Sequence, residues 1–316
     1  MDPILTVEDL KVYYKSTFGD VKSLDGASFS VKNNEIIGIA GESGCGKSTL
    51  VEGILQLIYP PGYIKSGKIL YKNIDLLHLK KDELRKLRWK EFSYIPQGSM
   101  NSLNPVITIE EQMIDAVTSH TNIQKKEAKE MALNTLKDVS LPAEVARMYA
   151  HQLSGGMKQR VIIGISVILK PSLIIADEPV TALDVFVQKS ILQSIRNLKD
   201  SFGMTIVFVS HDLAAHAEVV DELVIMYAGK IVEIGSVYDI FKDPLHPYSK
   251  LLIASIPSME NESLSGISGL APSPLNWPTG CRFHPRCPRV MPICSGKEPS
   301  LEQMKQGRHV ACHLYR

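Results

Sequence analysis

Short runs of alternating apolar and polar residues open the chain. Ile4–Tyr14 and Ser28–Ala40 both alternate in this way, and Asp-Gly and Asn-Asn turn signals interrupt the region. A period of two is typical of half-buried strands. We therefore expect a small β-rich region from about residue 4 to residue 40.

Longer apolar runs then alternate with helical patterns. Glu35–Ala40 predicts a buried strand, and Lys47–Ile58 has helical apolar spacing. Two later runs rich in Ile and Val, Ser172–Ala176 and Thr205–Val209, predict strands of the same sheet, with a helix between them at Val187–Leu198. The fold class we predict is α/β, with strand, glycine-rich loop and helix in succession.

The middle of the chain is predicted to be helical. Residues 99–152 are polar and helix-prone, and Thr108–Val117 and Lys125–Val139 show the clearest periodicity. We expect a helical subdomain at about residues 99–160.

The composition changes from Ile256 onward. Residues 256–299 are rich in Pro, Ser and Gly, and four of the five cysteines lie beyond residue 280. This composition indicates a loop-rich extension. We expect two domains, residues 1–255 and residues 256–316.

Overall composition is that of a globular protein, with 316 residues and 44% hydrophobic content. The 35 Lys and Arg residues nearly balance 34 Asp and Glu residues, so the net charge of +1 gives no footprint of a dedicated nucleic-acid binder. The longest apolar run, Val161–Leu169, is far shorter than the roughly 20 residues that span a bilayer. The first residues lack a secretory pattern, so we expect a cytoplasmic location. The net charge by itself neither names nor excludes a partner.

The segment between the first buried strand and its helix is a phosphate-binding loop. Gly41–Ser48 reads GESGCGKS, which matches GxxxxGKS in the structural context that such a loop requires. Glycines let backbone N–H groups turn toward phosphates, and the lysine adds a charge to the β and γ oxygens. The hydroxyl of Ser48 is expected on Mg²⁺ and that of Thr49 at a phosphate. The residues expected to bind nucleotide are Gly41, Ser43, Gly44, Cys45, Gly46, Lys47, Ser48 and Thr49.

A second acidic site is predicted where a later strand ends. Leu173–Glu178 is an apolar run that finishes in two carboxylates. Asp177 is suited to the Mg²⁺ shell, and Glu178 to orienting and polarising an attacking water. A solvated turn that merely ends a strand is the competing interpretation, and the phosphate-binding loop makes it the weaker one.

The segment Leu153–Arg160, LSGGMKQR, resembles the signature of ATP-binding cassette (ABC) proteins, and it precedes the acidic strand at the spacing of that family. Other positions match the family in order. Gln97 resembles its Q-loop glutamine, Ala182–Asp184 its D-loop, His211 its switch histidine and Tyr14 the aromatic that stacks on adenine. The resemblance implies a P-loop NTPase of RecA-like core with an N-terminal antiparallel β subdomain and a helical signature subdomain.

Roles follow from this resemblance. Gln97 would contact the metal shell or the water, and a neutral His211 would donate to the γ-phosphate. The family closes the signature of one cassette over ATP held by another, so Ser154, Gly155, Gly156 and Asp184 imply a dimer. The catalytic set is then Glu178, His211 and Gln97, and the Mg²⁺ set is Ser48, Gln97 and Asp177.

The tail narrows the resemblance to one branch. Asp243–Tyr248, DPLHPY, and Gly280–Pro288, GCRFHPRCP, resemble the C-terminal region of oligopeptide and dipeptide importer ATPases. The branch also includes oligosaccharide importers, so both cargoes stay open. The resemblance implies a peripheral subunit at the cytoplasmic face of the membrane. Its implied partners are a second, related ATPase, two transmembrane permeases and, indirectly, an extracellular substrate-binding protein.

Four cysteines form a possible metal site in the tail. The spacing of Cys281, Cys287, Cys294 and Cys312 suits either Zn²⁺ or an iron–sulfur cluster, whereas Cys45 is expected to be a small packing residue. A reduced, functionless set is the other interpretation, because structural disulfides are rare in the cytosol. Resemblance to the importer tail favours a [4Fe–4S] cluster.

Cassette ATPases that act on DNA or ribosomes are the main competing class. Those with long coiled coils need hundreds of residues between the phosphate-binding loop and the signature, but only residues 50–152 intervene here. A degenerate, regulatory cassette is disfavoured because Lys47, Asp177, Glu178 and His211 are all present.

Overall fold

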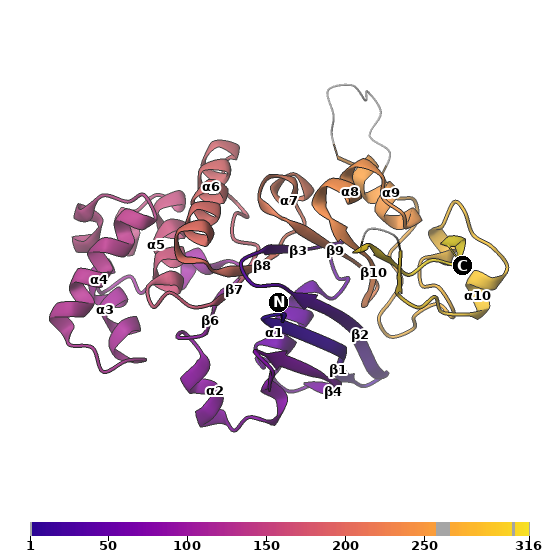
Figure 1. Cartoon of the computed structure of the whole chain (residues 1–316), viewed down its shortest axis with the longest axis horizontal. Coiled ribbons are helices and arrows are strands. Elements are labelled where there is room, and N and C mark those ends of the chain that lie inside the picture. The colour runs from indigo at the N-terminus through magenta and orange to yellow at the C-terminus, as the bar shows by residue number, and fades with distance from the viewer. Residues whose placement is uncertain (1, 257–265, 305–306, 316) are drawn as a thin grey trace. The chain divides into compact units, whose positions relative to one another are not determined.

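The computed structural model describes residues 2–256, 266–304 and 307–315. The chain divides into two compact units. The first consists of Met1–Lys32, Ile37–Leu77 and Ser210–Arg316, and the second of Asn33–Ile36 and His78–Val209. Most helices and strands of both units are labelled in Figure 1.

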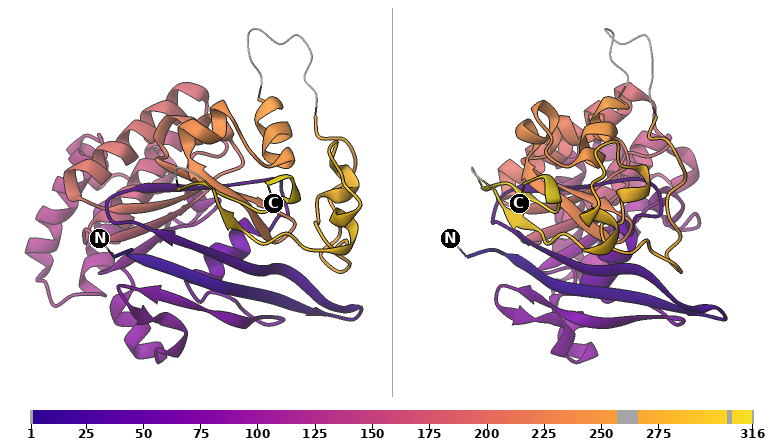
Figure 2. Two further views of the ribbon diagram at one scale, coloured as in Figure 1. Left: turned by 45° about the vertical axis from the view of Figure 1, so that its right-hand side comes forward. Right: turned by 90° about the vertical axis from the view of Figure 1, so that its right-hand side faces the viewer.

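An antiparallel sheet forms the N-terminal part of the first unit. Its strands are β1 (Leu5–Ser16), β2 (Gly19–Val31), β4 (Gly62–Tyr71) and β5 (Ile74–Asp75), in the order β2-β1-β4-β5. Leu5 pairs with Val31 and Ser16 with Gly19, so β1 and β2 form one long hairpin (Figure 2). Leu5 and Val7 are buried with a less buried residue between them, as the alternating pattern predicts.

The first unit also contains a mixed sheet. In it, β3 (Ile36–Ala40) runs parallel to β9 (Glu222–Tyr227), and β9 is antiparallel to β10 (Lys230–Ser236). The C-terminal segment adds β12 (His309–Val310) to β10 and β11 (Glu302–Gln303) to β12. The helices of this unit are α1 (Lys47–Ile54), α7 (Leu213–Val219), α8 (Val237–Lys242), α9 (Pro247–Ala254) and α10 (Ile293–Gly296).

Three neighbouring strands of the second unit run parallel in a sheet. Phe92 of β6 (Phe92–Ile95) pairs with Leu173 of β7 (Leu173–Asp177), which pairs with Thr205 of β8 (Thr205–Val209). Helices α5 (Gly155–Val167) and α6 (Val185–Phe202) cover this sheet, and their side chains meet those of the strands in a small apolar cavity. The apolar cavity is lined by Ile95, Ile163, Val167, Ile174, Ala176, Ile195, Leu198, Met204 and Ile206.

Helices α2 (Lys81–Leu87), α3 (Ile109–Thr118) and α4 (Lys125–Asp138) complete the second unit. Thr108 caps α3 in a reciprocal arrangement with Glu111, which satisfies two backbone donors at the helix start. Arg160 of α5 donates to the carbonyl of Val139 at 2.8 Å and to the hydroxyl of Ser194 in α6 at 3.0 Å. The guanidinium of Arg160 therefore joins α5 to the C-terminal end of α4 and to α6.

One predicted helix ends earlier than expected, and one predicted domain boundary lies beside residues that the structure does not describe. The helix expected over Lys47–Ile58 ends at Ile54, because Gln56 adopts a left-handed conformation with φ +51°. The domain boundary expected at residue 256 adjoins residues 257–265, which lie outside the described residues. Within the described ranges, no helix combines the length and apolar character needed to cross a membrane.

Candidate functional site

The phosphate-binding loop lies between β3 and α1 in the first unit, as predicted. Gly44 and Gly46 have φ of +78° and +103°, which side chains other than glycine rarely tolerate. A Cβ at Gly46 would also lie 2.6 Å from the carbonyl oxygen of Ser23 in β2. A Cβ at Gly41 would collide with the carbonyl oxygen of Met226 in β9. The glycines are therefore required both by backbone conformation and by close approach of neighbouring strands.

Lys47 points into its own loop. Its buried ammonium donates to the carbonyl oxygens of Gly41 at 2.8 Å and Glu42 at 3.2 Å. The hydroxyls of Thr49 and Ser23 lie 2.8 Å apart, and Ser48 is exposed at the start of α1. A positive charge and two hydroxyl groups thus accompany the backbone N–H groups of the loop.

Tyr14 and His211 belong to the same unit as the loop. Tyr14 is half-buried, its ring packs on Gly62, and its hydroxyl donates to the carboxylate of Glu52 in α1 at 3.3 Å. Burial raises the pKa of Tyr14, so the phenol stays protonated. His211 is exposed just before α7.

Asp177 and Glu178 end β7 in the second unit. Both are buried, with 2% and 9% of their surfaces exposed. Glu178 has φ +54°, its N–H donates to the carbonyl of Val209 at 2.8 Å, and its carboxylate accepts the hydroxyl of Thr181. A non-glycine residue in the left-handed region is held there by its surroundings, and such strain is concentrated at functional sites.

The other predicted residues of the second unit lie at element ends. Gln97 is exposed after β6. Ser154 caps α5 by accepting the N–H of Met157 at 3.3 Å, and Asp184 caps α6 by accepting the N–H of Val187 at 3.0 Å. A Cβ at Gly156 would lie 2.6 Å from the side chain of Val187, so a glycine lets the starts of the two helices approach.

The four tail cysteines line a single cavity in the first unit. The N–H of Cys281 donates to the carbonyl of Cys294 at 2.8 Å, which joins two of the cysteine-bearing turns. Burial raises the pKa of Cys281 to about 11 and that of Cys287 and Cys312 above their usual range. Among the described residues, no group of three or more His, Cys, Asp or Glu side chains is gathered so as to hold a metal ion.

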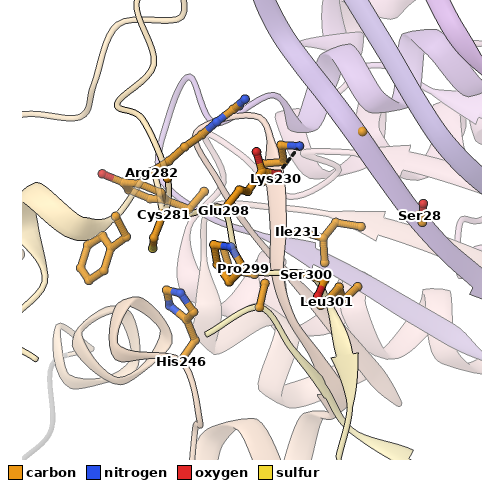
Figure 3. A pocket seen from close by; sticks show the side chains of 16 residues that line it. Ser28, Lys230, Ile231, His246, Cys281, Arg282, Glu298, Pro299, Ser300 and Leu301 are labelled. Atoms are coloured by element: carbon orange, nitrogen blue, oxygen red, sulfur yellow. Dashed lines mark ion pairs between the residues drawn. The ribbon is translucent and has the colours of Figure 1, made fainter. Parts of the chain in front are cut away.

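A larger cavity of about 220 Å³ adjoins the one lined by the cysteines (Figure 3). Cys281, Phe283 and His246 line both cavities. The Lys230–Glu298 ion pair, at 2.6 Å, lies on the wall of the larger one. No residue of the phosphate-binding loop lines it, so it is separate from the nucleotide site.

Comparisons with known proteins identify the family of this chain. The ABC transporter family matches residues 24–181, and the family described as oligopeptide/dipeptide transporter, C-terminal region, matches residues 232–294. The dipeptide transport ATP-binding protein DppD of Caldanaerobacter subterraneus is 43% identical over 100% of this chain and 98% of its own length. The oligopeptide transport ATP-binding protein OppD of Escherichia coli is 40% identical over 98% and 93%.

The chain belongs to the ABC transporter family. A solved dimeric structure of the ATP-binding cassette MJ0796, in a post-hydrolysis state with ADP and Pi, superposes with a TM-score of 0.66. The two chains are 27% identical, and the match covers 74% of this chain and 98% of the solved one. The protein is thus an ABC transporter ATPase, and it binds and hydrolyses ATP. Its relatives are of the oligopeptide/dipeptide transporter type.

Sequence analysis missed how the tail of this ABC ATPase contacts its phosphate-binding loop. The backbone N–H of Glu42 donates to the hydroxyl of Tyr248 at 2.9 Å, and Arg286 forms an ion pair with the carboxylate of Glu42. Tyr248 belongs to the His-Pro-Tyr segment and Arg286 precedes Cys287, so both lie in recognised motifs. A charged residue inside a loop that binds phosphates was the signal that Glu42 requires a cationic partner.

Proposed function

We propose that this ABC ATPase energises the uptake of oligopeptides or dipeptides. The observation that carries the proposal is full-length similarity, at about 40% identity, to proteins named dipeptide or oligopeptide transport ATP-binding proteins. Similarity extends into the tail, where residues 232–294 match the oligopeptide/dipeptide transporter C-terminal region. An oligosaccharide cargo is the alternative outcome of the test below.

The catalytic roles we propose are those of a phosphoryl-transfer site. Lys47 binds the β- and γ-phosphates, and Glu178 orients and polarises the water. The left-handed backbone of Glu178 supports this role, because its carboxylate is held at the strand end instead of relaxing into a solvated turn. Gln97 and His211 complete the set, as contacts to the water or metal shell and to the γ-phosphate. Tyr14 is proposed to contact adenine.

Ser48, Asp177 and Gln97 are proposed to hold Mg²⁺. Ser48 provides an exposed hydroxyl at the start of α1, and Asp177 a buried carboxylate at the end of β7. These oxygen donors, with Gln97, are the kind that Mg²⁺ prefers. Bound Mg²⁺ would neutralise charge that develops on the phosphate oxygens.

We propose that the subunit works as one half of a heterodimer of two related cassettes. The exposed N-terminus of α5, capped by Ser154, is suited to an anion held by a facing subunit. Phe186, which follows the predicted D-loop, is 88% exposed, and a partner surface is the natural place to bury such a side chain. Gly155, Gly156 and Asp184 are proposed to contact the partner's nucleotide.

The four cysteines are proposed to hold a [4Fe–4S] cluster. They line one cavity, but their side chains are not gathered as ligands of a single ion would be. Four thiolates suit either Zn²⁺ or a cluster, and resemblance to the importer tail is what favours the cluster. The cluster would cross-link a segment with little apolar content, and residues 256–316 would form the domain that it holds next to the ATPase domain of residues 1–255.

The proposed assembly includes two transmembrane permeases, and this subunit binds to them at the cytoplasmic face of the membrane. Residues 99–115, beside Gln97, are proposed to contact the permeases. An extracellular binding protein would act indirectly, and no nucleic acid is involved.

The function is tested by purifying the tagged chain with its natural partners from membranes. Two permeases and a second cassette are expected, and the reconstituted complex should hydrolyse ATP faster when its binding protein is loaded with di- or oligopeptides. If only oligosaccharides stimulate ATP hydrolysis, the cargo is an oligosaccharide, and the chain is still the ATPase of an importer. Recovery with ribosomes or DNA in place of permeases would refute the proposal.

A further inference from the structure

We propose that Arg286 is a positioning residue for the phosphate-binding loop, through which the cysteine-bearing tail controls the affinity of this subunit for ATP. The proposal rests on ATP binding by the family and is independent of the cargo and of the metal in the tail.

Arg286 and Glu42 form a bidentate ion pair. Nη1 of Arg286 lies 2.8 Å from Oε2 of Glu42, and Nη2 lies 3.0 Å from Oε1. The Arg286 side chain is only 6% exposed and that of Glu42 is 26% exposed, so solvent screens the pair less than it screens a surface ion pair. Paired parallel hydrogen bonds between guanidinium and carboxylate fix direction as well as distance.

The tail holds Arg286 independently of the loop. Its Nε donates to the carbonyl of Ser268 at 2.9 Å and its Nη2 to that of Ile267 at 3.2 Å. Its Nη1 donates to the hydroxyl of Tyr227 at 3.3 Å. Because these partners lie in the tail and in β9, the guanidinium is already oriented before it meets Glu42. The side chain of Arg286 is therefore held in one orientation, unlike a mobile surface side chain.

Glu42 is restrained from three sides. Its carboxylate is held by Arg286, its N–H by Tyr248 and its carbonyl by the ammonium of Lys47 at 3.2 Å. Glu42 is the second residue of the loop, and its carbonyl takes part in orienting the lysine that serves the phosphates. A displacement of Glu42 would therefore be passed directly to the part of the loop that binds ATP.

The negative charge of Glu42 also affects ATP binding. Glu42 brings a carboxylate into a loop whose ligand is a polyanion, and an unneutralised carboxylate there would repel ATP. Arg286 cancels that charge. Loss of Arg286 therefore both frees the loop and exposes the repulsion, whereas loss of the Glu42 charge alone leaves a cation near the phosphates.

The test measures ATP affinity of the full chain by calorimetry, first for the wild type and then for three variants. Arg286→Met is expected to weaken ATP binding about tenfold, within the usual range of coupling between sites. Glu42→Gln, whose amide oxygen still accepts from Arg286, should bind ATP at least as tightly as the wild type. The double variant should resemble Glu42→Gln, and the deficit of Arg286→Met should shrink in high salt.

Arg308→Met provides the control, because it removes another buried arginine–carboxylate pair, with Glu233, in the same unit. It is expected to lower the melting temperature while leaving ATP affinity within about twofold of the wild type, as for sites that do not couple. If wild-type protein binds ATP and Arg286→Met binds it equally well, the inference is wrong. Equal losses of ATP affinity in Glu42→Gln and Arg286→Met, or in Arg308→Met and Arg286→Met, would also show that the inference is wrong, because the ion pair would then give structural support only. If Arg286→Met does not fold, Arg286→Lys is tested in its place. It keeps the positive charge but cannot form the bidentate pair with Glu42, so a smaller loss of ATP affinity is expected.

Discussion

The hydroxyl of Tyr248 accepts a hydrogen bond from the backbone N–H of Glu42 at 2.9 Å, across 206 positions of sequence. His246 caps α9 by accepting the N–H of Tyr248 at 3.0 Å, and Pro247 occupies the first turn. The His-Pro-Tyr segment therefore starts a helix in such a way that its tyrosine reaches the phosphate-binding loop. Burial raises the pKa of Tyr248, so the hydroxyl remains protonated at neutral pH.

Replacing Tyr248 with phenylalanine should leave the N–H of Glu42 without this acceptor. The expected loss in free energy of unfolding is about 1–2 kcal/mol, the usual cost of depriving a buried polar group of its partner. ATP affinity should fall several-fold. Tyr238→Phe is the control, because Tyr238 is exposed and its hydroxyl accepts a hydrogen bond from the side chain of Lys242. Equal stability of both variants in urea titrations would contradict the assigned role of Tyr248.

Glu178→Gln should retain ATP binding and lose turnover by roughly 10²–10⁴, the scale expected for a general base. The amide keeps the shape of the side chain but cannot accept the proton of the attacking water. Turnover is measured as phosphate release by the assembled transporter, and ATP affinity is measured separately. Glu130→Gln, on the exposed face of α4, should be unchanged. Normal turnover in Glu178→Gln would remove this residue from the catalytic set.

Lys47→Ala should act on binding instead. The variant removes the charge placed at the phosphates, so the dissociation constant for ATP is expected to rise by about tenfold or more, since hydrogen bonds between charged groups are about twice as strong as neutral ones. Calorimetry with ATP gives the value directly. Lys126→Ala, an exposed position of α4, is the matched control. Unchanged affinity in Lys47→Ala would show that the ammonium does not contact the nucleotide.

The metal content of anaerobically purified protein should be about four irons per chain, with visible absorbance, as a cluster held by four cysteines implies. Cys294→Ser should lower the iron content and destabilise the tail, since the other three thiols lose a shared cross-link. Cys45→Ser, in the phosphate-binding loop, should keep its iron. Colourless protein with one zinc would replace the cluster and leave the four-cysteine site standing.

Stability should fall in mild acid because of His246. Burial lowers the pKa of His246 to about 3, whereas an unfolded histidine titrates near 6.5. Below about pH 6.5 the unfolded chain therefore binds a proton that the folded chain excludes, and the loss grows until about pH 3. At pH 5 this costs about 2 kcal/mol relative to neutral pH.

His246→Asn tests the pH effect, since asparagine can still cap α9 but does not titrate. The difference in urea midpoint between pH 7.5 and pH 5 should become smaller in the variant. The nearby carboxylate of Glu233 accepts the backbone N–H groups of Leu245 and His246 in both proteins, so its contribution is common to them. An identical pH dependence would show that another group causes the acid sensitivity.

Local pattern was sufficient for much of this protein. Period-two alternation over Ile4–Tyr14 predicted β1, and the run Ser28–Ala40 covered only the end of β2 and the whole of β3. Helical spacing over Thr108–Val117 and Lys125–Val139 predicted α3 and α4 to within a residue or two. The phosphate-binding loop could be located because its conformation is imposed by its own glycines and by the flanking strand and helix. Such features depend on neighbours in sequence, so the order of residues carries them.

Tertiary structure decided what lies beside the loop. The short strands β11 and β12 extend the sheet of β10, although their own residues carry no strand pattern, because the exposed edge of β10 supplies the pairing. In the sequence, Glu42 is one position of the GESGCGKS motif and Arg286 one position of GCRFHPRCP, and neither motif points to the other. Their ion pair joins positions 244 residues apart, and only the folded chain brings two such charges to the same place. Pairing between distant residues leaves no periodic trace in sequence, which is why composition and motifs could not reveal it.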